Sequence, residues 1–414
     1  MKKAIRHLAY LLLALLSVVL IAAGCKSGSD GEKLSQADLE RQAVDSKVNL
    51  MLVEAQDAFH QGAFGVALAL TDSAEHYAPE LADTPFLRGL IYTKMRLFDK
   101  ARFSYEKVLE LDPDYHGVKL NLGSTALRQG RPRDALKWYR KEQEAYSSPA
   151  ILLQMGRAYA ELGVVDSAKQ AYLQAIAADS SYATAYFRLS EVYKDEGELE
   201  LALEYSRRGL GLDPDNLNYR YMLGSLLLLE GQLEEAEDHL QQVVRNRAWH
   251  YWAHYNLGQA LMRLDRRKEG QYFLDLADSL KESVQEIENW RSLAEMNPDQ
   301  LMLWVNYGDA LRRAGRIDEA IEAHHIAMSL APRNIALQNN LANLYLMHGD
   351  TAWAIAGYRR VLHQDPTVAD AWLNLGMVYA SMGKTEAAEQ SWENVLKFNP
   401  GDSTAKAYLE TLSD

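Results

Sequence analysis

The sequence predicts an all-α fold, a solenoid of about ten helical hairpins, and two observations lead to it. A pattern of small residues, leucines and aromatic residues recurs with a period of about 34 residues between positions 48 and 402. Glycine marks one fixed point of this pattern and proline marks another. Because a repeat of roughly 20–50 residues is the signature of stacked structural units, we expect each repeat to be one pair of helices.

Small residues define the hairpin when the positions of the repeat are numbered from 1 to 34. Positions 8 and 20 should be where the two helices, A and B, approach most closely. Position 8 holds Ala55, Gly89, Gly123, Gly156, Ser190, Gly224, Gly258, Gly308, Ala342 and Gly376. Position 20 holds Ala67, Ala101, Ala135, Ala168, Ala202, Ala236, Gly270, Ala320, Ala354 and Ala388.

Turn and stop residues complete the unit. Position 15 carries glycine in eight units, where a left-handed turn residue is expected between the helices. These glycines are Gly62, Gly130, Gly163, Gly197, Gly231, Gly315, Gly349 and Gly383. Proline at position 32, as in Pro113 and Pro400, stops helix B before the next unit.

The last complete unit identifies a family resemblance. The segment "AWLNLGMVYASMGKTEAAEQSWENVLKFNP" carries Trp372, Leu375, Gly376 and Tyr379, followed by Ala388, Trp392 and Pro400. This order resembles the tetratricopeptide repeat (TPR) signature. The resemblance implies a right-handed α-solenoid (superhelix) whose helices A line a concave groove for a protein or peptide partner, with no cofactor.

Two irregularities divide the predicted array. The third unit is one residue short, and the seventh is longer than the others by nearly half a repeat. We expect helix B of the seventh unit to continue to about residue 295, or to break once. The predicted domains are units 1–7 over residues 43–300, with a helical extension at 278–300, units 8–10 over 301–402, and a capping helix over 403–414.

The N-terminus is typical of an exported lipoprotein. Lys2, Lys3 and Arg6 precede an apolar run that ends at Ala23. This run is shorter than the ~20 residues that a membrane-spanning helix needs. Residues 21–24 and Cys25, the only cysteine in the chain, resemble the bacterial lipobox. The resemblance implies cleavage after residue 24 and lipidation of Cys25. The alternative is an ordinary signal peptide or anchor with an incidental cysteine.

The residues after Cys25 predict a tether and a location. Residues 25–42 are expected to be a flexible tether that starts with a Gly/Ser/Asp-rich stretch and spans roughly 25 Å. Lys26 is not the aspartate associated with inner-membrane retention. We therefore expect anchoring in the bacterial cell envelope, at the outer membrane rather than the inner, on its periplasmic face.

Charge and motifs exclude several function classes. The net charge is −13, which argues against binding to nucleic acid or to anionic lipid surfaces. No phosphate-binding loop, catalytic serine motif or zinc-protease motif is present. His250 with His254, and His324 with His325, are interpreted as structural rather than as metal ligands. O-GlcNAc transferases carry a similar array followed by a catalytic domain; we expect none here and no enzymatic activity.

The candidate site is the helix-A wall. Position 5 is apolar or aromatic in nine of ten units, and asparagine occupies position 6 in several consecutive units, where its amide could bind a peptide backbone. The alternative is that these residues pack between neighbouring helices A. The candidate residues are Phe86, Leu120, Leu153, Phe187, Tyr221, Trp252, Tyr255, Asn256, Val305, Asn306, Asn340, Leu373 and Asn374.

The function that follows is a membrane-anchored scaffold for a partner protein or peptide. A carboxylate clamp of the heat-shock co-chaperone type is not expected, because position 5 carries no basic residue. The alternative is an envelope assembly or secretion factor, a pilotin-like lipoprotein or one associated with polysaccharide export, that carries or localises a subunit. The sequence leaves the partner and the oligomeric state open.

Overall fold

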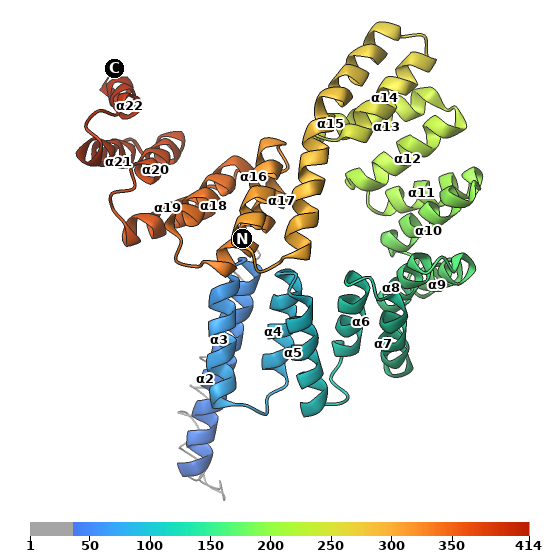
Figure 1. Cartoon of the computed structure of the whole chain (residues 1–414), viewed down its shortest axis with the longest axis horizontal. Helices are drawn as coiled ribbons and strands as arrows, with labels where there is room; N and C mark the ends of the chain where they lie inside the picture. The colour runs from blue at the N-terminus through green and yellow to red at the C-terminus, as the bar shows by residue number, and fades with distance from the viewer. Residues whose placement is uncertain (1–35, 414) are drawn as a thin grey trace, which may run out of the picture. The chain divides into compact units, whose positions relative to one another are not determined.

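The structure, a computed structural model, describes residues 36–413, which form helices α2 to α22 and no β-strand (Figure 1). The all-α prediction is therefore confirmed. The predicted signal peptide and Cys25 lie outside the described residues. The described residues from Leu50 onward form one compact unit. Among the described residues, no helix combines the length and hydropathy that a bilayer-spanning segment requires.

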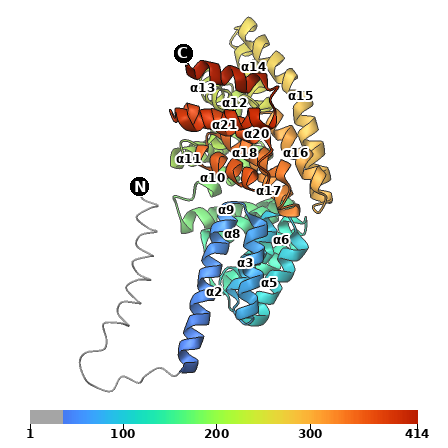
Figure 2. The same ribbon diagram turned by 90° about the vertical axis from the view of Figure 1, so that its left-hand side faces the viewer.

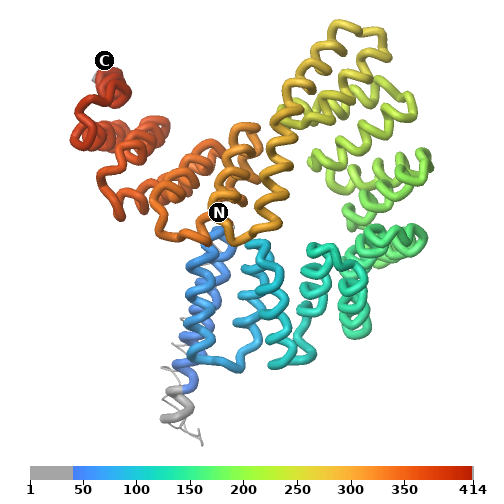
Figure 3. Tube along the Cα trace, viewed as in Figure 1, coloured from blue at the N-terminus to red at the C-terminus, as the bar shows by residue number. Residues whose placement is uncertain are grey.

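The helices form ten hairpins in succession. From α3 to α22 each helix packs on its neighbours in the chain, and α2 shares a buried cluster with α3 (Figure 3). The A helices are α2 Gln36–His60, α4 Asp83–Lys94, α6 Val118–Arg128, α8 Pro149–Glu161, α10 Ala183–Glu196, α12 Leu217–Glu230, α14 Tyr251–Arg263, α16 Leu301–Arg313, α18 Ile335–His348 and α20 Ala369–Ser381. The B helices are α3 Phe64–Tyr77, α5 Phe98–Leu111, α7 Pro132–Ala145, α9 Val165–Ala178, α11 Leu199–Leu212, α13 Leu233–Asn246, α15 Arg267–Met296, α17 Ile317–Leu330, α19 Thr351–Gln364 and α21 Thr385–Phe398. The chain continues into α22, Ser403–Ser413, where the capping helix was expected.

The first helix begins earlier than expected. We expected a flexible tether as far as residue 42, but α2 already starts at Gln36. Its first turns, "QADLERQA", consist mainly of alanine, leucine, glutamate, arginine and glutamine, which have high helix propensity. The tether prediction therefore fails for residues 36–42, and its earlier part lies outside the described residues.

A ring from helix B fills the space above the small residue at position 8. A Cβ atom added to Gly123 would lie under 3.0 Å from the ring of Tyr139, which stands at position 24 and is fully buried. Gly89 and Tyr105 repeat this arrangement one unit earlier. The repeat pattern predicted that helices A and B approach most closely at positions 8 and 20. The structure adds position 24, because its aromatic side chain lies directly against the glycine.

Position 15 takes a left-handed conformation in every unit that has glycine there, as predicted, with φ between 68° and 94°. Two units lack glycine at this position, and both keep the conformation. Arg96 has φ 58° and Asp265 has φ 61°. The tight connection between helices A and B is therefore retained even where the sequence carries no glycine signal.

The long seventh unit ends in one uninterrupted helix, α15, which runs to Met296. This is the first of the two alternatives that the sequence left open. Ile287 and Ala294, both within the extension, are buried in the same cluster as Trp304 of α16. We expected the array to divide near residue 300. Residues 50–414 instead form one compact unit, because the extension packs its apolar face against the next hairpin.

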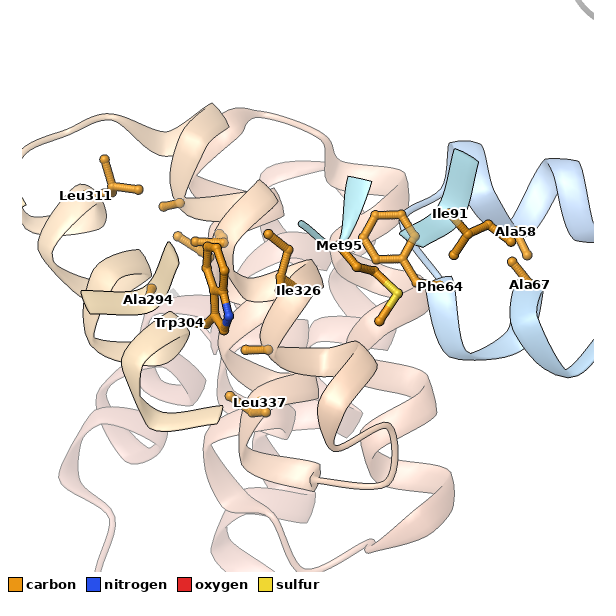
Figure 4. Close-up of a cluster of buried hydrophobic side chains, with 14 of the residues drawn as sticks. Ala58, Phe64, Ala67, Ile91, Met95, Ala294, Trp304, Leu311, Ile326 and Leu337 are labelled. Atoms are coloured by element: carbon orange, nitrogen blue, oxygen red, sulfur yellow. The ribbon is translucent and has the colours of Figure 1, made fainter. Parts of the chain in front are cut away.

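The first hairpin also contacts the eighth, although six complete hairpins separate the two along the chain. Helix α3 packs on α17, and the two helices lie next to each other in both Figure 1 and Figure 2. Phe64 is buried in one cluster with Met95 and Ile326, and Figure 4 shows the three side chains between the two ribbons. Arg96 Nη1 lies 2.5 Å from Glu295 Oε1 at the edge. We call this junction the α3–α17 contact. The repeat pattern did not predict it.

Candidate functional site

The helix-A wall is mostly half-buried. Phe187 stacks on Tyr219 of the next unit, with ring centroids 4.8 Å apart. Phe86 packs against Tyr115 with the rings tilted by 42° and their centroids 4.9 Å apart. Leu120, Val305 and Leu373 are partly buried hydrophobic residues of the core clusters. The position-5 residues therefore contribute to packing between hairpins, which was the alternative interpretation of this stripe.

One candidate residue is removed from the list. Leu153 is 4% exposed and lies inside a core cluster with Leu152 and Leu189. A side chain without accessible surface cannot contact a partner unless the array opens. We therefore correct its assignment from the partner-binding groove to the core.

Exposed aromatic surface on the wall is concentrated on α14. Trp252 is 55% exposed and Tyr255 is 37% exposed. Their rings meet edge to face at 6.0 Å, and Tyr251 stacks on Tyr255 at 6.3 Å. Large aromatic side chains that remain accessible are the usual anchors of protein interfaces. We call Trp252 and Tyr255 the α14 aromatic pair.

The polar groups beside this pair are already ordered. Tyr221 packs its ring 4.6 Å from that of His250, whose burial lowers its pKa to about 4. Asn256 Nδ2 donates to Ser225 Oγ at 3.0 Å. Tyr221 and His250 are therefore held against each other, and His250 is uncharged at neutral pH.

The asparagines at position 6 divide into two groups. Asn256 and Asn374 bond across to the preceding hairpin, Asn374 through Nδ2 to Asn343 Oδ1 at 2.8 Å. Asn306 and Asn340 are half-buried, and their side chains form no hydrogen bond with any residue in the described part of the chain. These four asparagines stand at position 6 of consecutive units. Two of them thus link hairpins, and two keep an amide that a peptide could bind.

The paired histidines act within the fold. His254 Nε2 lies 2.9 Å from the carbonyl oxygen of Ala248, and His324 Nδ1 lies 3.0 Å from that of Ala320. Burial lowers the pKa of both imidazoles. In residues 36–413 no three His, Cys, Asp or Glu side chains are placed to hold a metal ion.

A cavity of about 830 Å³ lies beside the α3–α17 contact. It is lined by residues of the first, second, third, eighth and ninth hairpins, among them Phe59, Lys94, Arg128 and Glu322. The charged residues among these, Lys94, Arg128 and Glu322, were not candidates from the sequence. The sequence signal for a cationic site here was a basic residue at position 13 of two successive units, Lys94 and Arg128. The space in front of these residues is enclosed only because α3 packs on α17.

Stacked hairpins with an accessible aromatic pair on one helix-A surface define this protein as an α-solenoid of the class that binds other proteins. The chain belongs to the tetratricopeptide repeat family. Family models described as tetratricopeptide repeat match residues 369–402 and residues 86–148, 153–216, 195–251 and 287–324, which together exceed half of the chain. This confirms the family that the repeat signature predicted.

The chain is similar to parts of longer proteins. The human protein O-mannosyl-transferase TMTC3 is 25% identical over 193 residues, which are 46% of this chain and 21% of that protein. The CTR9 homologue of Arabidopsis thaliana is 22% identical over 88% of this chain and 40% of that protein. The chain thus spans about a fifth of TMTC3 and two fifths of the CTR9 homologue.

The chain is also similar to parts of the solved structures of MamA and PilW. MamA is 25% identical over 44% of this chain and 96% of its own, with a TM-score of 0.34. PilW, described as a type IV pilus biogenesis factor, is 19% identical over 52% of this chain and 98% of its own, with a TM-score of 0.46.

Proposed function

We propose that this protein is a membrane-anchored scaffold that holds a partner protein or peptide on its helix-A wall, centred on the α14 aromatic pair. The repeat fold supports binding of a protein partner. The location of the binding surface on α14 is supported by Trp252 and Tyr255. These side chains stay 55% and 37% exposed, while other aromatic side chains of the wall are packed. Tyr221 contacts His250 and Asn256, which stand just before and just after this stretch of α14 in the sequence.

The α14 aromatic pair provides the test of this proposal. Trp252→Ala and Tyr255→Ala should each weaken capture of the partner about tenfold in crosslinking pull-downs from membranes of the source cell. Full desolvation of one aromatic anchor contributes roughly 1.5–3 kcal/mol, and about 1.4 kcal/mol corresponds to a factor of ten. Because both side chains are exposed in the free protein, neither change should greatly lower the thermal midpoint.

A matched control lies on helix B of the same hairpin. Tyr272 is 60% exposed on α15, so Tyr272→Ala removes a comparable ring outside the wall. This variant should capture the partner as well as the unchanged protein does. Equal capture by all three variants, or loss only with Tyr272→Ala, would reject the wall as the binding surface. The identity of the captured protein then separates a scaffold from an assembly factor.

We also propose that the scaffold is tethered by lipid on Cys25 to the cell envelope, at the periplasmic face of the outer membrane. This proposal is supported by the basic start, the short apolar run and the single cysteine after Gly24. Two or more acyl chains are enough for stable anchoring, whereas one chain binds only reversibly.

Cys25→Ser should abolish lipidation and leave the precursor uncleaved. Mass spectrometry of the mature N-terminus should find a diacylglycerol-modified cysteine as the first residue, because the thiol is the nucleophile that receives the lipid. An unmodified cysteine, or a mature chain that starts elsewhere, contradicts the proposal. Ser27→Ala, two residues further on, is the control and should be processed normally.

A further inference from the structure

The cavity beside the α3–α17 contact carries more positive than negative charge. Lys94, Arg96 and Arg128 line it, whereas Glu322 is the only carboxylate among the lining residues that the structure describes. Glu322 pairs with Lys94 at 3.3 Å, in a contact where both side chains are more than half exposed. Such exposed pairs contribute little and exchange easily. Arg96 is paired at 2.5 Å with Glu295, which is not a lining residue.

Lys94 and Arg96 have carboxylate partners, whereas Arg128 has none among the residues that the structure describes. Its guanidinium forms no ion pair and no hydrogen bond with any side chain or carbonyl in residues 36–413. The residue is exposed, and water reaches the side chain through the open cavity. Surrounding protein atoms lower its pKa, the charges of Arg96 and Arg157 lower it further, and the charge of Glu322 raises it. A guanidinium that faces a partly enclosed space without a partner can gain charge-assisted hydrogen bonds from an added anion.

The rest of the lining combines apolar side chains with the polar residues His60, Gln61, Thr93, His325 and Tyr345. Phe59, Leu90, Ile321 and Ile326 face the same space, with Phe64 at the α3–α17 contact. His325 is held by Tyr345 at 2.7 Å, and burial lowers its pKa to about 4, so it adds no positive charge at neutral pH. The volume of about 830 Å³ lies within the usual range of ligand pockets.

We propose that this cavity binds a peptide carboxylate that is flanked by apolar side chains, with Arg128 as its principal partner. The carboxylate supplies the charge that Arg128 lacks, and the guanidinium can receive it through two parallel hydrogen bonds. The flanking side chains cover Phe59 and Ile321. This inference rests on the proposed binding of a protein partner and specifies one contact of that partner, away from the α14 aromatic pair.

Three short peptides test the inference by isothermal titration of the full chain. They are acetyl-Leu-Glu-Phe-amide, acetyl-Leu-Gln-Phe-amide, and acetyl-Leu-Gln-Phe with a free C-terminal carboxylate. At least one of the two acidic peptides should bind ten times more tightly than the neutral peptide. Comparison of the two acidic peptides shows whether a side chain or a chain end supplies the carboxylate.

Arg128→Gln should remove this tenfold preference. Because Arg128 has no partner in the fold, its replacement leaves no carboxylate unpaired, and circular dichroism should show an unchanged fold. Arg133→Gln, at an exposed position on α7 that does not line the cavity, removes the same charge and should keep the preference.

Three results would overturn the inference: equal affinity of all peptides, no binding at millimolar concentration, or a preference that survives Arg128→Gln. Partner capture by the same preparations is scored in parallel. If capture depends on Trp252 and Tyr255 but the peptides show no selectivity, the cavity proposal is rejected and the proposal for the helix-A wall stands. If the peptides show the selectivity but capture does not depend on Trp252 and Tyr255, the proposal for the helix-A wall is rejected and the cavity proposal stands.

Discussion

Replacement of Gly123 with alanine should lower the free energy of unfolding by about 1–3 kcal/mol, the usual cost of overpacking a core. Helix propensity alone predicts the opposite, a gain of up to ~1 kcal/mol for alanine in a helix interior. Sterics should win, because the new Cβ would lie under 3.0 Å from the fully buried ring of Tyr139. Chemical denaturation followed by circular dichroism measures the change.

Gly211 provides the matched control on helix α11. A Cβ added to this glycine meets no atom within 4 Å. Gly211→Ala should therefore show the helix-propensity gain without a steric cost, so the two substitutions should have opposite signs. If both stabilise the protein, or neither changes it, Tyr139 moves freely and the account of position 8 fails.

Other units of this chain show how the clash is avoided when position 8 has a Cβ. Ser190 occupies position 8 in the fifth unit, and the residue at position 24 there is Ser206. In the first unit Ala55 is matched by Thr71. Both pairs are buried, so the same volume is divided differently between helices A and B. Gly123→Ala and Tyr139→Thr should therefore be non-additive when combined, with a smaller loss than their sum.

Phe64→Ala should release the α3–α17 contact, at a cost of about 3–5 kcal/mol for a buried aromatic residue. Phe64 is 6% exposed and lies 6.1 Å from the ring of His325. Hydrogen exchange should rise in α3 and α17, while helices α20 and α21, which do not touch this contact, should keep their protection.

Two further variants define the origin of this effect. Phe103→Ala removes the same ring where it is 70% exposed, and its cost should stay within about 0.5 kcal/mol. Arg96→Ala breaks the ion pair with Glu295, in which both side chains are more than a third exposed, and should cost at most about 1 kcal/mol. Apolar burial, rather than charge, then holds the contact. Unchanged exchange in α17 after Phe64→Ala would show that the contact is not formed in solution.

Much of the fold could be predicted from the sequence because each hairpin is determined within a single repeat. Gly123, Ala135 and Gly130 lie close enough along the chain to identify a helix, a turn and a second helix without knowledge of the rest. The candidate wall was less predictable. Its position-5 residues form a stripe in the sequence pattern, but their exposure depends on the adjacent hairpin, and so Leu153 is buried while Tyr255 is not.

The sequence by itself determined the helices, their phase and the family of this protein, because those features depend on contacts within one repeat or between consecutive repeats. Only the tertiary structure decided that α3 meets α17 and that a cationic cavity lies beside this contact. The small rotation between each hairpin and the next accumulates over seven steps before the first and the eighth can meet. The periodic pattern specifies each step as the same kind of contact but does not specify its angle, so residues as distant as Phe64 and His325 carry no sequence signal of their proximity.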